Sequence, residues 1–107
     1  MNVLVLGSTG VVGDAIVRES LRDERISLVF AVSRRPLVHA HARLRTLLLA
    51  NFLDFAPIGA QLVEIDAVLC ALGLSWYQAP SEAEYRKITH DYVMACARAA
   101  AVANPAL

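Results

Sequence analysis

The chain has 107 residues, of which 57% are hydrophobic and 19% charged, and its ten basic residues balance ten acidic ones. This length predicts a single domain. There is no basic run of the kind that binds nucleic acid, and no apolar run is long enough to span a bilayer. We therefore expect neither a nucleic acid nor a membrane as a partner.

The first predicted elements are a strand and a helix with a glycine-rich turn between them. Residues 2–6 form a short Val/Leu-rich run, which is typical of a strand that is covered on both faces. Residues 11–23 carry apolar side chains at helical spacing, with charged side chains between them. The run "SLVFAV", residues 27–32, predicts a second strand, and Pro36 prevents its continuation.

The second half of the chain continues the alternation. Residues 37–43 form either a loop or one or two helical turns, and 44–50 predict a third strand. A short helix is expected over 57–63, because Pro57 suits a first helical turn. A fourth strand follows over 66–73. A long helix then begins at Pro80 or Ser81, where Ser81 and Glu84 match a capping box, and it runs to about Ala103.

This alternation of strands and helices predicts an α/β fold. It is typical of a Rossmann-like parallel sheet of about four strands with helices on both faces. Because crossover connections are right-handed, we expect the strand order 3-2-1-4, in one domain that spans residues 1–107.

The turn "GSTGVVG" between the first strand and the first helix predicts an anion-binding site. Gly7 allows a tight turn, Gly10 lets the backbone approach a pyrophosphate, and Gly13 lets the helix pack closely on the sheet. The first N–H groups of the helix attract the anion, and the hydroxyls of Ser8 and Thr9 add donors. The alternative is a glycine-rich turn that holds no ligand.

The end of the second strand bears on the choice of cofactor. An NAD site places Asp or Glu there for the ribose 2′-hydroxyl. This chain has Ser33, Arg34 and Arg35 instead, and arginine suits the 2′-phosphate of NADP. NADP(H) is therefore expected rather than NAD(H). The alternative is a solvated basic turn.

These motifs together resemble a known superfamily. "VLVLGSTGVVG", "SRRP", "LLLANFLDF", "DAVLCALG" and the helix "YRKITHDYVMACARAA" are similar to the atypical short-chain dehydrogenase/reductases, above all the Tat-interacting-protein-like and NmrA-like members. The resemblance implies an NAD(P)-binding Rossmann fold, and this chain is shorter than the family. Where the family has Gly-Asp after the third strand, this chain has Ala50 and Asn51.

The resemblance also implies a set of cofactor-binding residues. The residues of the glycine turn, 7–13, would line the pyrophosphate. Arg34 and Arg35 would meet the 2′-phosphate, and Asn51 and Phe52 would lie near the adenine. Ala71, Leu72 and Gly73, at the end of the fourth strand, would lie along the nicotinamide ribose. The full set is Gly7, Ser8, Thr9, Gly10, Val11, Val12, Gly13, Arg34, Arg35, Asn51, Phe52, Ala71, Leu72 and Gly73. Trp76 and Tyr77 either contact the nicotinamide or substrate or simply pack.

The catalytic elements of the family lie outside this pattern. Its catalytic Ser and Tyr-x-x-x-Lys follow the helix that ends this sequence, and neither Tyr85 nor Tyr92 has Lys at the fourth following position. We assign no catalytic residue and no metal ligand. Three hypotheses follow: the cofactor-binding half of an NADP-dependent reductase or epimerase, a non-catalytic NADP(H)-sensing regulatory module, or a structural domain without nucleotide.

The remaining residues predict location and assembly. Cys70 and Cys96 are interpreted as buried, reduced thiols, which together with the lack of a secretory signal predict a cytoplasmic protein. His39 and His41 are interpreted as solvated loop residues. The apolar fourth strand would be an exposed edge, so a homo-oligomer is expected.

Overall fold

The computed structural model describes residues 1–72 and 81–105. Four strands alternate with helices along the chain. The first half contains β1 (Asn2–Leu6), α1 (Val11–Arg22), β2 (Leu28–Ser33) and β3 (Leu44–Leu48). A 3-10 turn, η1 (Ala56–Ile58), leads to α2 (Gly59–Leu62) and β4 (Ala67–Cys70), and the long C-terminal helix consists of α3 (Glu82–Arg86), the π-helical turn η2 (Lys87–Asp91) and α4 (Tyr92–Ala103).

The four strands form one parallel sheet in the order β3-β2-β1-β4, which confirms the predicted fold class and strand order. β1 lies in the interior, where Val5 pairs with Ala31 of β2 and with Leu69 of β4. From β1 the chain first adds β2 and β3 on one side of the sheet, and it then returns to add β4 on the other side of β1. This reversal creates the switch point at which α/β sheets bind ligands, beyond the carboxyl ends of the strands.

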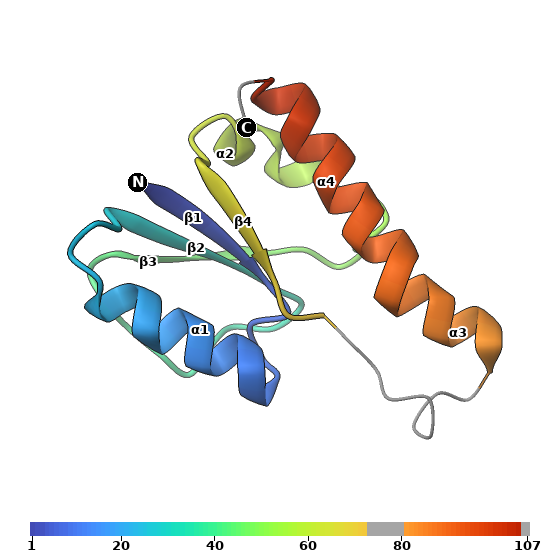
Figure 1. Ribbon diagram of the computed structural model, residues 1–107, viewed down its shortest axis with the longest axis horizontal. Helices are drawn as coiled ribbons and strands as arrows, with labels where there is room; N and C mark the ends of the chain where they lie inside the picture. Colours follow the sequence, from blue (N-terminus) through green and yellow to red (C-terminus); the bar gives the residue numbers. More distant parts are fainter. Residues whose placement is uncertain (73–80, 106–107) are drawn as a thin grey trace.

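Helices cover both faces of the sheet, as the alternation predicted (Figure 1). On one face, Val3, Val5 and Val29 pack with Val17 of α1. On the other face, Leu4 and Leu6 pack with Leu62 of α2 and with Cys96 of α4. The strands are near-continuous apolar runs because neighbouring residues serve opposite cores, and each core is covered by a helix.

Two local expectations are decided by the structure. Residues 37–43 form a loop without helical turns. The helix predicted from Ser81 onward is present, and the Oγ of Ser81 accepts a hydrogen bond of 3.1 Å from the N–H of Glu84, so Ser81 is the N-cap. The turn η2 interrupts this helix at Lys87–Asp91 and was not predicted.

One prediction about the core is wrong. Cys96 is buried, but Cys70 is exposed, because β4 is an edge strand and Cys70 is its last residue. The fourth strand was expected at the edge of the sheet, but its apolar neighbours in the sequence do not show that the thiol of Cys70 is left uncovered there.

Candidate functional site

The glycine turn after β1 is tight for reasons that differ among its three glycines. Gly7 has a φ of +88°, and a Cβ on it would lie 2.7 Å from the backbone of Ala71 and Leu72. A Cβ on Gly13 would overlap the carbonyl oxygen of Gly7. A Cβ on Gly10 would meet no atom of the described chain closer than 3.7 Å. The fold therefore requires Gly7 and Gly13, but it leaves open space in front of Gly10.

The N-terminus of α1 opens into that space. Gly10 is its N-cap and supplies no side-chain hydrogen bond, and the first bond of the helix runs from the N–H of Asp14 to the carbonyl of Gly10. The N–H groups of Val11, Val12 and Gly13 therefore have no partner within the helix. The side chains of Val11 and Val12 are 90% and 65% exposed. These backbone groups, with the helix dipole, make the turn attractive to an anion.

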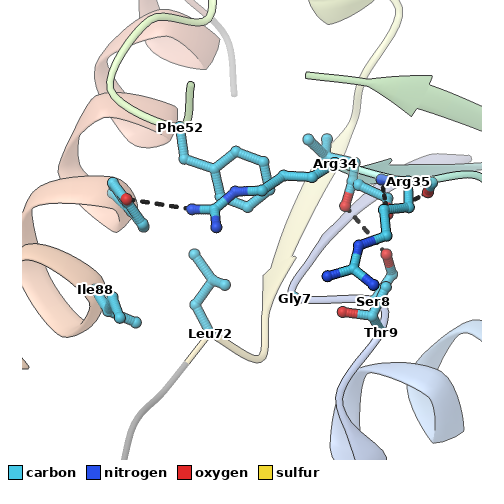
Figure 2. A pocket seen from close by; sticks show the side chains of 11 residues that line it. Gly7, Ser8, Thr9, Arg34, Arg35, Phe52, Leu72 and Ile88 are labelled. Carbon is cyan, nitrogen blue, oxygen red and sulfur yellow. Dashed lines mark hydrogen bonds between the residues drawn. The ribbon is translucent and has the colours of Figure 1, made fainter. Parts of the chain in front are cut away.

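A cavity of about 410 Å³ lies beside this turn, at the carboxyl ends of the strands (Figure 2). Its walls come from the segments that follow β1, β2, β3 and β4 and from the long C-terminal helix. The lining residues are Gly7, Ser8, Thr9, Val32, Ser33, Arg34, Arg35, Phe52, Leu72, Ile88 and Tyr92. The cavity lies at the switch point between β2, β1 and β4, the position that the topology predicts for a ligand.

The charge of the cavity is entirely positive. Arg34 and Arg35 line it, and no carboxylate is among its lining residues. Within the part of the chain that the structure describes, neither guanidinium pairs with Asp or Glu. Other arginines do have such partners: Arg18 pairs with Asp14 and Arg25 with Asp23. Two uncompensated arginines at the mouth of a cavity favour a ligand with negative charge.

The two arginines point to different ends of the cavity. In Figure 2, the side chain of Arg35 extends toward Ser8 and Thr9 of the glycine turn, whereas Arg34 extends toward Phe52. The guanidinium carbon of Arg34 lies 4.9 Å from the centre of the Phe52 ring, and its Nη2 donates a 3.2 Å hydrogen bond to the hydroxyl of Tyr92. The cavity thus has a positive group near the helix N-terminus and another over an aromatic wall.

Two serines shape the turns that carry these groups. Ser8 is buried, and its hydroxyl donates to the carbonyl oxygen of Val32 over 3.1 Å. Ser33, also buried, accepts a 3.2 Å hydrogen bond from the N–H of Arg35. Ser8 was predicted to offer a hydroxyl donor to a ligand, and in this structure its proton joins the β1 and β2 turns. Thr9 is exposed and lines the cavity.

The structure brings seven of the predicted residues into the cavity wall, namely Gly7, Ser8, Thr9, Arg34, Arg35, Phe52 and Leu72. Gly10, Val11, Val12 and Gly13 lie in the adjoining first turn of α1 but are not part of that wall, and neither is Ala71. Gly73, Trp76 and Tyr77 lie outside the described residues.

Asn51 is placed differently from what the resemblance implied. Its side chain is exposed, outside the cavity wall, and its Oδ1 accepts a 2.9 Å hydrogen bond from the N–H of Leu53. This Asx turn uses the oxygen that was expected to meet an adenine amine. Asn51 therefore orders the loop that leads to Phe52.

Sequence reasoning did not assign four wall residues: Val32, Ser33, Ile88 and Tyr92. Val32 and Ser33 directly precede Arg34 in the sequence. Ile88 and Tyr92 come from the long helix, and the spacing of apolar residues along that helix could have indicated them. Tyr92, Cys96 and Ala100 recur every four residues and are all buried, so this face of the helix lies on the sheet, and Ile88 lies one turn earlier.

The loop after the arginines is held against α1. The imidazole Nε2 of His39 contacts the carboxylate of Asp14 in the first turn of α1, and Arg18 lies 2.9 Å from the same carboxylate. The hydrogen bond from His39, followed by that from Arg18, lowers the pKa of Asp14. The expectation of a solvated His39 is therefore wrong, whereas His41 is exposed. The contact anchors the β2–β3 loop near the glycine turn.

Within residues 1–72 and 81–105, no three His, Cys, Asp or Glu side chains gather as a metal site would require. No helix in the same part of the chain has the length and hydropathy needed to cross a bilayer.

The sequence comparisons found relatives but no matching family model. "Protein FMP52, mitochondrial" of Chaetomium globosum is 38% identical over 101 residues, which are 91% of this chain and 42% of the relative. The protein of the same name from Eremothecium gossypii is 29% identical over 103 residues, which are 94% of this chain and 44% of the relative. The chain thus spans less than half the length of these curated relatives.

Solved structures share the fold. Uronate dehydrogenase from Agrobacterium tumefaciens, whose Y136A mutant was solved with NAD, aligns with a TM-score of 0.73 and 18% identity, over 97% of this chain and 37% of its own. A short-chain dehydrogenase family protein from Francisella tularensis gives 0.71 and 15%, over 92% and 44%. MoeE5, solved with UDP-glucose and NAD, gives 0.61 and 31%, over 92% and 33%. The chain therefore has the Rossmann fold of short-chain dehydrogenases and corresponds to a part of them.

The comparisons correct the predicted location. Both curated relatives are named mitochondrial proteins, which contradicts a cytoplasmic location. The prediction rested on unpaired cysteines and the lack of a secretory signal. These features separate reducing compartments from the secretory pathway, but they do not distinguish one reducing compartment from another.

Proposed function

We propose that this chain is the NADP(H)-binding part of a short-chain reductase- or epimerase-like protein of mitochondria. The observation that carries the proposal is the cavity at the sheet's switch point, with the glycine turn on one side and two uncompensated arginines on another. The fold it shares with NAD-bound neighbours supports a dinucleotide. The arginines after β2, in place of a carboxylate, favour the phosphorylated form.

Each part of the dinucleotide has residues that would hold it. The free N–H groups at the start of α1 and the guanidinium of Arg35 would bind the pyrophosphate, and open space at Gly10 leaves room for it. Arg34 would bind the 2′-phosphate, since only one of its five donors is engaged with Tyr92. The ring of Phe52 would form the adenine wall, and Leu72 would lie along the nicotinamide ribose.

The role of this stretch is to bind and orient the cofactor. When bound, the nicotinamide would supply hydride transfer. The described residues offer no Tyr-x-x-x-Lys pair, because Tyr85 is followed by Thr89 and Tyr92 by Cys96 at the fourth position. The hydroxyl of Tyr92 also accepts from Arg34, in a structural contact. The second candidate function is a non-catalytic module that senses NADP(H).

The test is calorimetric titration of the 107-residue chain with NADPH and, separately, NADH. We expect micromolar binding of NADPH and at least about tenfold weaker binding of NADH, because charge-assisted hydrogen bonds to the 2′-phosphate are absent in NADH. Arg34→Ala combined with Arg35→Ala should abolish this preference. Arg45→Ala is the matched control, since Arg45 is exposed on β3 and outside the cavity. No binding of either dinucleotide would refute the proposal.

A separate measurement decides between the two functions. NADPH oxidation by the full-length natural protein with a carbonyl substrate would refute the sensing module. Binding without turnover over a panel of such substrates would support it.

We also propose that the protein forms a homo-oligomer through its β4 edge. β4 pairs with β1 on one side only within the described residues, and it carries no charged side chain.

A further inference from the structure

The side chain of Arg34 is held in place by groups from two distant segments. Its guanidinium carbon lies 4.9 Å from the centre of the Phe52 ring and 5.7 Å from that of Tyr92, and its Nη2 donates to the Tyr92 hydroxyl over 3.2 Å. Figure 2 shows the guanidinium between the Phe52 ring and the long helix. An arginine in an exposed turn normally samples many rotamers, and these contacts remove most of that freedom.

Tyr92 is itself rigidly placed. It is buried, with 8% of its surface exposed, and its ring packs edge-to-face with the Phe52 ring, with centres 5.6 Å apart and planes at 70°. It begins α4, whose buried residues Cys96 and Ala100 seat the same helix face on the sheet. The hydroxyl that receives Arg34 is therefore fixed by the core and does not depend on a flexible loop.

A second cation approaches the same ring. The ammonium of Lys87, in the π-helical turn η2, lies 5.9 Å from the centre of the Tyr92 ring. Among the described residues, neither Lys87 nor Arg34 has a carboxylate partner. The electron-rich ring stabilises both cations without cancelling their charge, so this end of the cavity stays positive and Arg34 keeps four donors for an anion.

We propose that Tyr92 is a positioning residue that sets the selectivity of the cavity for a 2′-phosphorylated nucleotide, by holding Arg34 against Phe52 in its phosphate-binding orientation. This inference rests on the proposed function. A side chain ordered before binding loses less entropy when the phosphate arrives. The benefit applies only to the phosphate that Arg34 contacts, so Tyr92 should affect ligands with a 2′-phosphate and leave other adenine nucleotides alone.

The test uses two small probes, adenosine 2′,5′-bisphosphate and AMP, which differ only in the 2′-phosphate. Tyr92→Phe keeps the ring and removes the hydroxyl. We expect it to weaken binding of the bisphosphate about 3- to 10-fold, the range for one lost hydrogen bond, and to change AMP binding less than twofold. Thr89→Val is the matched control, because it removes a hydroxyl from the same helix outside the cavity wall; it should change neither affinity.

A double-mutant comparison separates positioning from general destabilisation. In the Arg34→Ala background, Tyr92→Phe should cause no further loss of bisphosphate binding, because the group it acts through is gone. Equal weakening of both probes, an unchanged bisphosphate affinity, or full additivity with Arg34→Ala would each overturn the inference while nucleotide binding itself stands. Failure of the wild-type chain to bind either probe would overturn the proposed function as well.

Discussion

Gly7, Gly10 and Gly13 share one motif, but the structure constrains them differently. Gly7 has a positive φ and abuts the chain after β4, and Gly13 abuts the carbonyl of Gly7. The fold therefore requires glycine at both positions, whether or not a ligand binds. Gly10 has a φ of −76°, and a Cβ there would meet only an ordinary contact of 3.7 Å with the carbonyl oxygen of Gly7, so neither the backbone nor the packing of the described chain excludes a side chain there. The absence of a side chain at Gly10 therefore matters chiefly for a ligand that binds against the turn.

This difference predicts that alanine at Gly13 lowers the stability of the fold, whereas alanine at Gly10 lowers the affinity for the cofactor. Gly13→Ala should destabilise the fold by about 3 kcal/mol, because its Cβ has no space without a shift of the Gly7 backbone. Gly10→Ala should cost about 1 kcal/mol or less, the typical difference between Gly and Ala at an N-cap. It should nevertheless weaken NADPH binding by about tenfold or more, because one methyl group blocks the approach of the pyrophosphate.

Urea unfolding and calorimetry on the same preparations measure both quantities. The Gly10→Ala protein serves as the folded reference for Gly13→Ala. Gly10→Ala with wild-type affinity for NADPH would show that the pyrophosphate does not approach the turn at Gly10.

The long C-terminal helix and β4 place two chemically identical side chains in different surroundings. Cys96, on the buried face of α4, is 1% exposed, and burial, with a smaller contribution from the nearby Cys70, raises the pKa of its thiol from 9.0 to about 12. Cys70 ends β4 and is exposed. Because only the thiolate is a good nucleophile, the two thiols should differ sharply in reactivity.

Alkylation measures this difference. At pH 8, and at a protein concentration low enough to dissociate the expected oligomer, iodoacetamide should add one group to the native chain and two groups to the chain in urea, as counted by intact mass. Cys70→Ser should remove the native adduct. A native adduct that persists in Cys70→Ser would show that the α4 face opens readily.

The raised pKa of Cys96 also predicts a loss of stability in alkali. The folded state holds this proton more tightly than the unfolded chain, so the stabilisation that the protonated Cys96 thiol provides is fully present below the unfolded-state pKa of 9.0. It is lost as the pH rises from there toward 12, the folded-state value. Urea midpoints at pH 7, 9 and 10.5 should therefore fall more steeply for the wild type than for Cys96→Ala. Parallel slopes would contradict this assignment.

At the scale of the whole molecule, the two edges of the sheet differ. β3 carries Arg45, an exposed charge that discourages pairing with another chain, whereas β4 has the sequence Ala-Val-Leu-Cys without any charge. An uncharged, apolar edge strand is a template for a further strand. The curated relatives extend well beyond the stretch that this chain matches.

We expect the 107-residue chain to be a dimer or a larger oligomer at micromolar concentration, with β4 at the interface. Cys70→Lys should shift it toward the monomer in light scattering, because it places a charge on the exposed end of that edge. Thr46→Lys, on the exposed surface of β3, is the control and should leave the mass unchanged. A monodisperse wild-type monomer would contradict the prediction.

The sequence alone determined the elements, their order and the place of the glycine turn. The runs 2–6 and 27–32 could be assigned as strands, and the structure has them at Asn2–Leu6 and Leu28–Ser33. The strand order followed from the alternation, because right-handed crossover connections are a general rule of parallel sheets. The arginines after β2 were found for the same reason, as they directly follow a strand.

Only the tertiary structure decided how the side chains of the cavity are used. It joined Arg34 to Tyr92, 58 residues further on, and gave the hydroxyl proton of Ser8 to Val32. It also made Cys70 exposed and Cys96 buried, and it left space at Gly10 but none at Gly13. These outcomes depend on which surfaces come into contact when helices pack on a sheet. Contacts between residues that are distant in the chain leave no local pattern in the sequence from which they could be predicted.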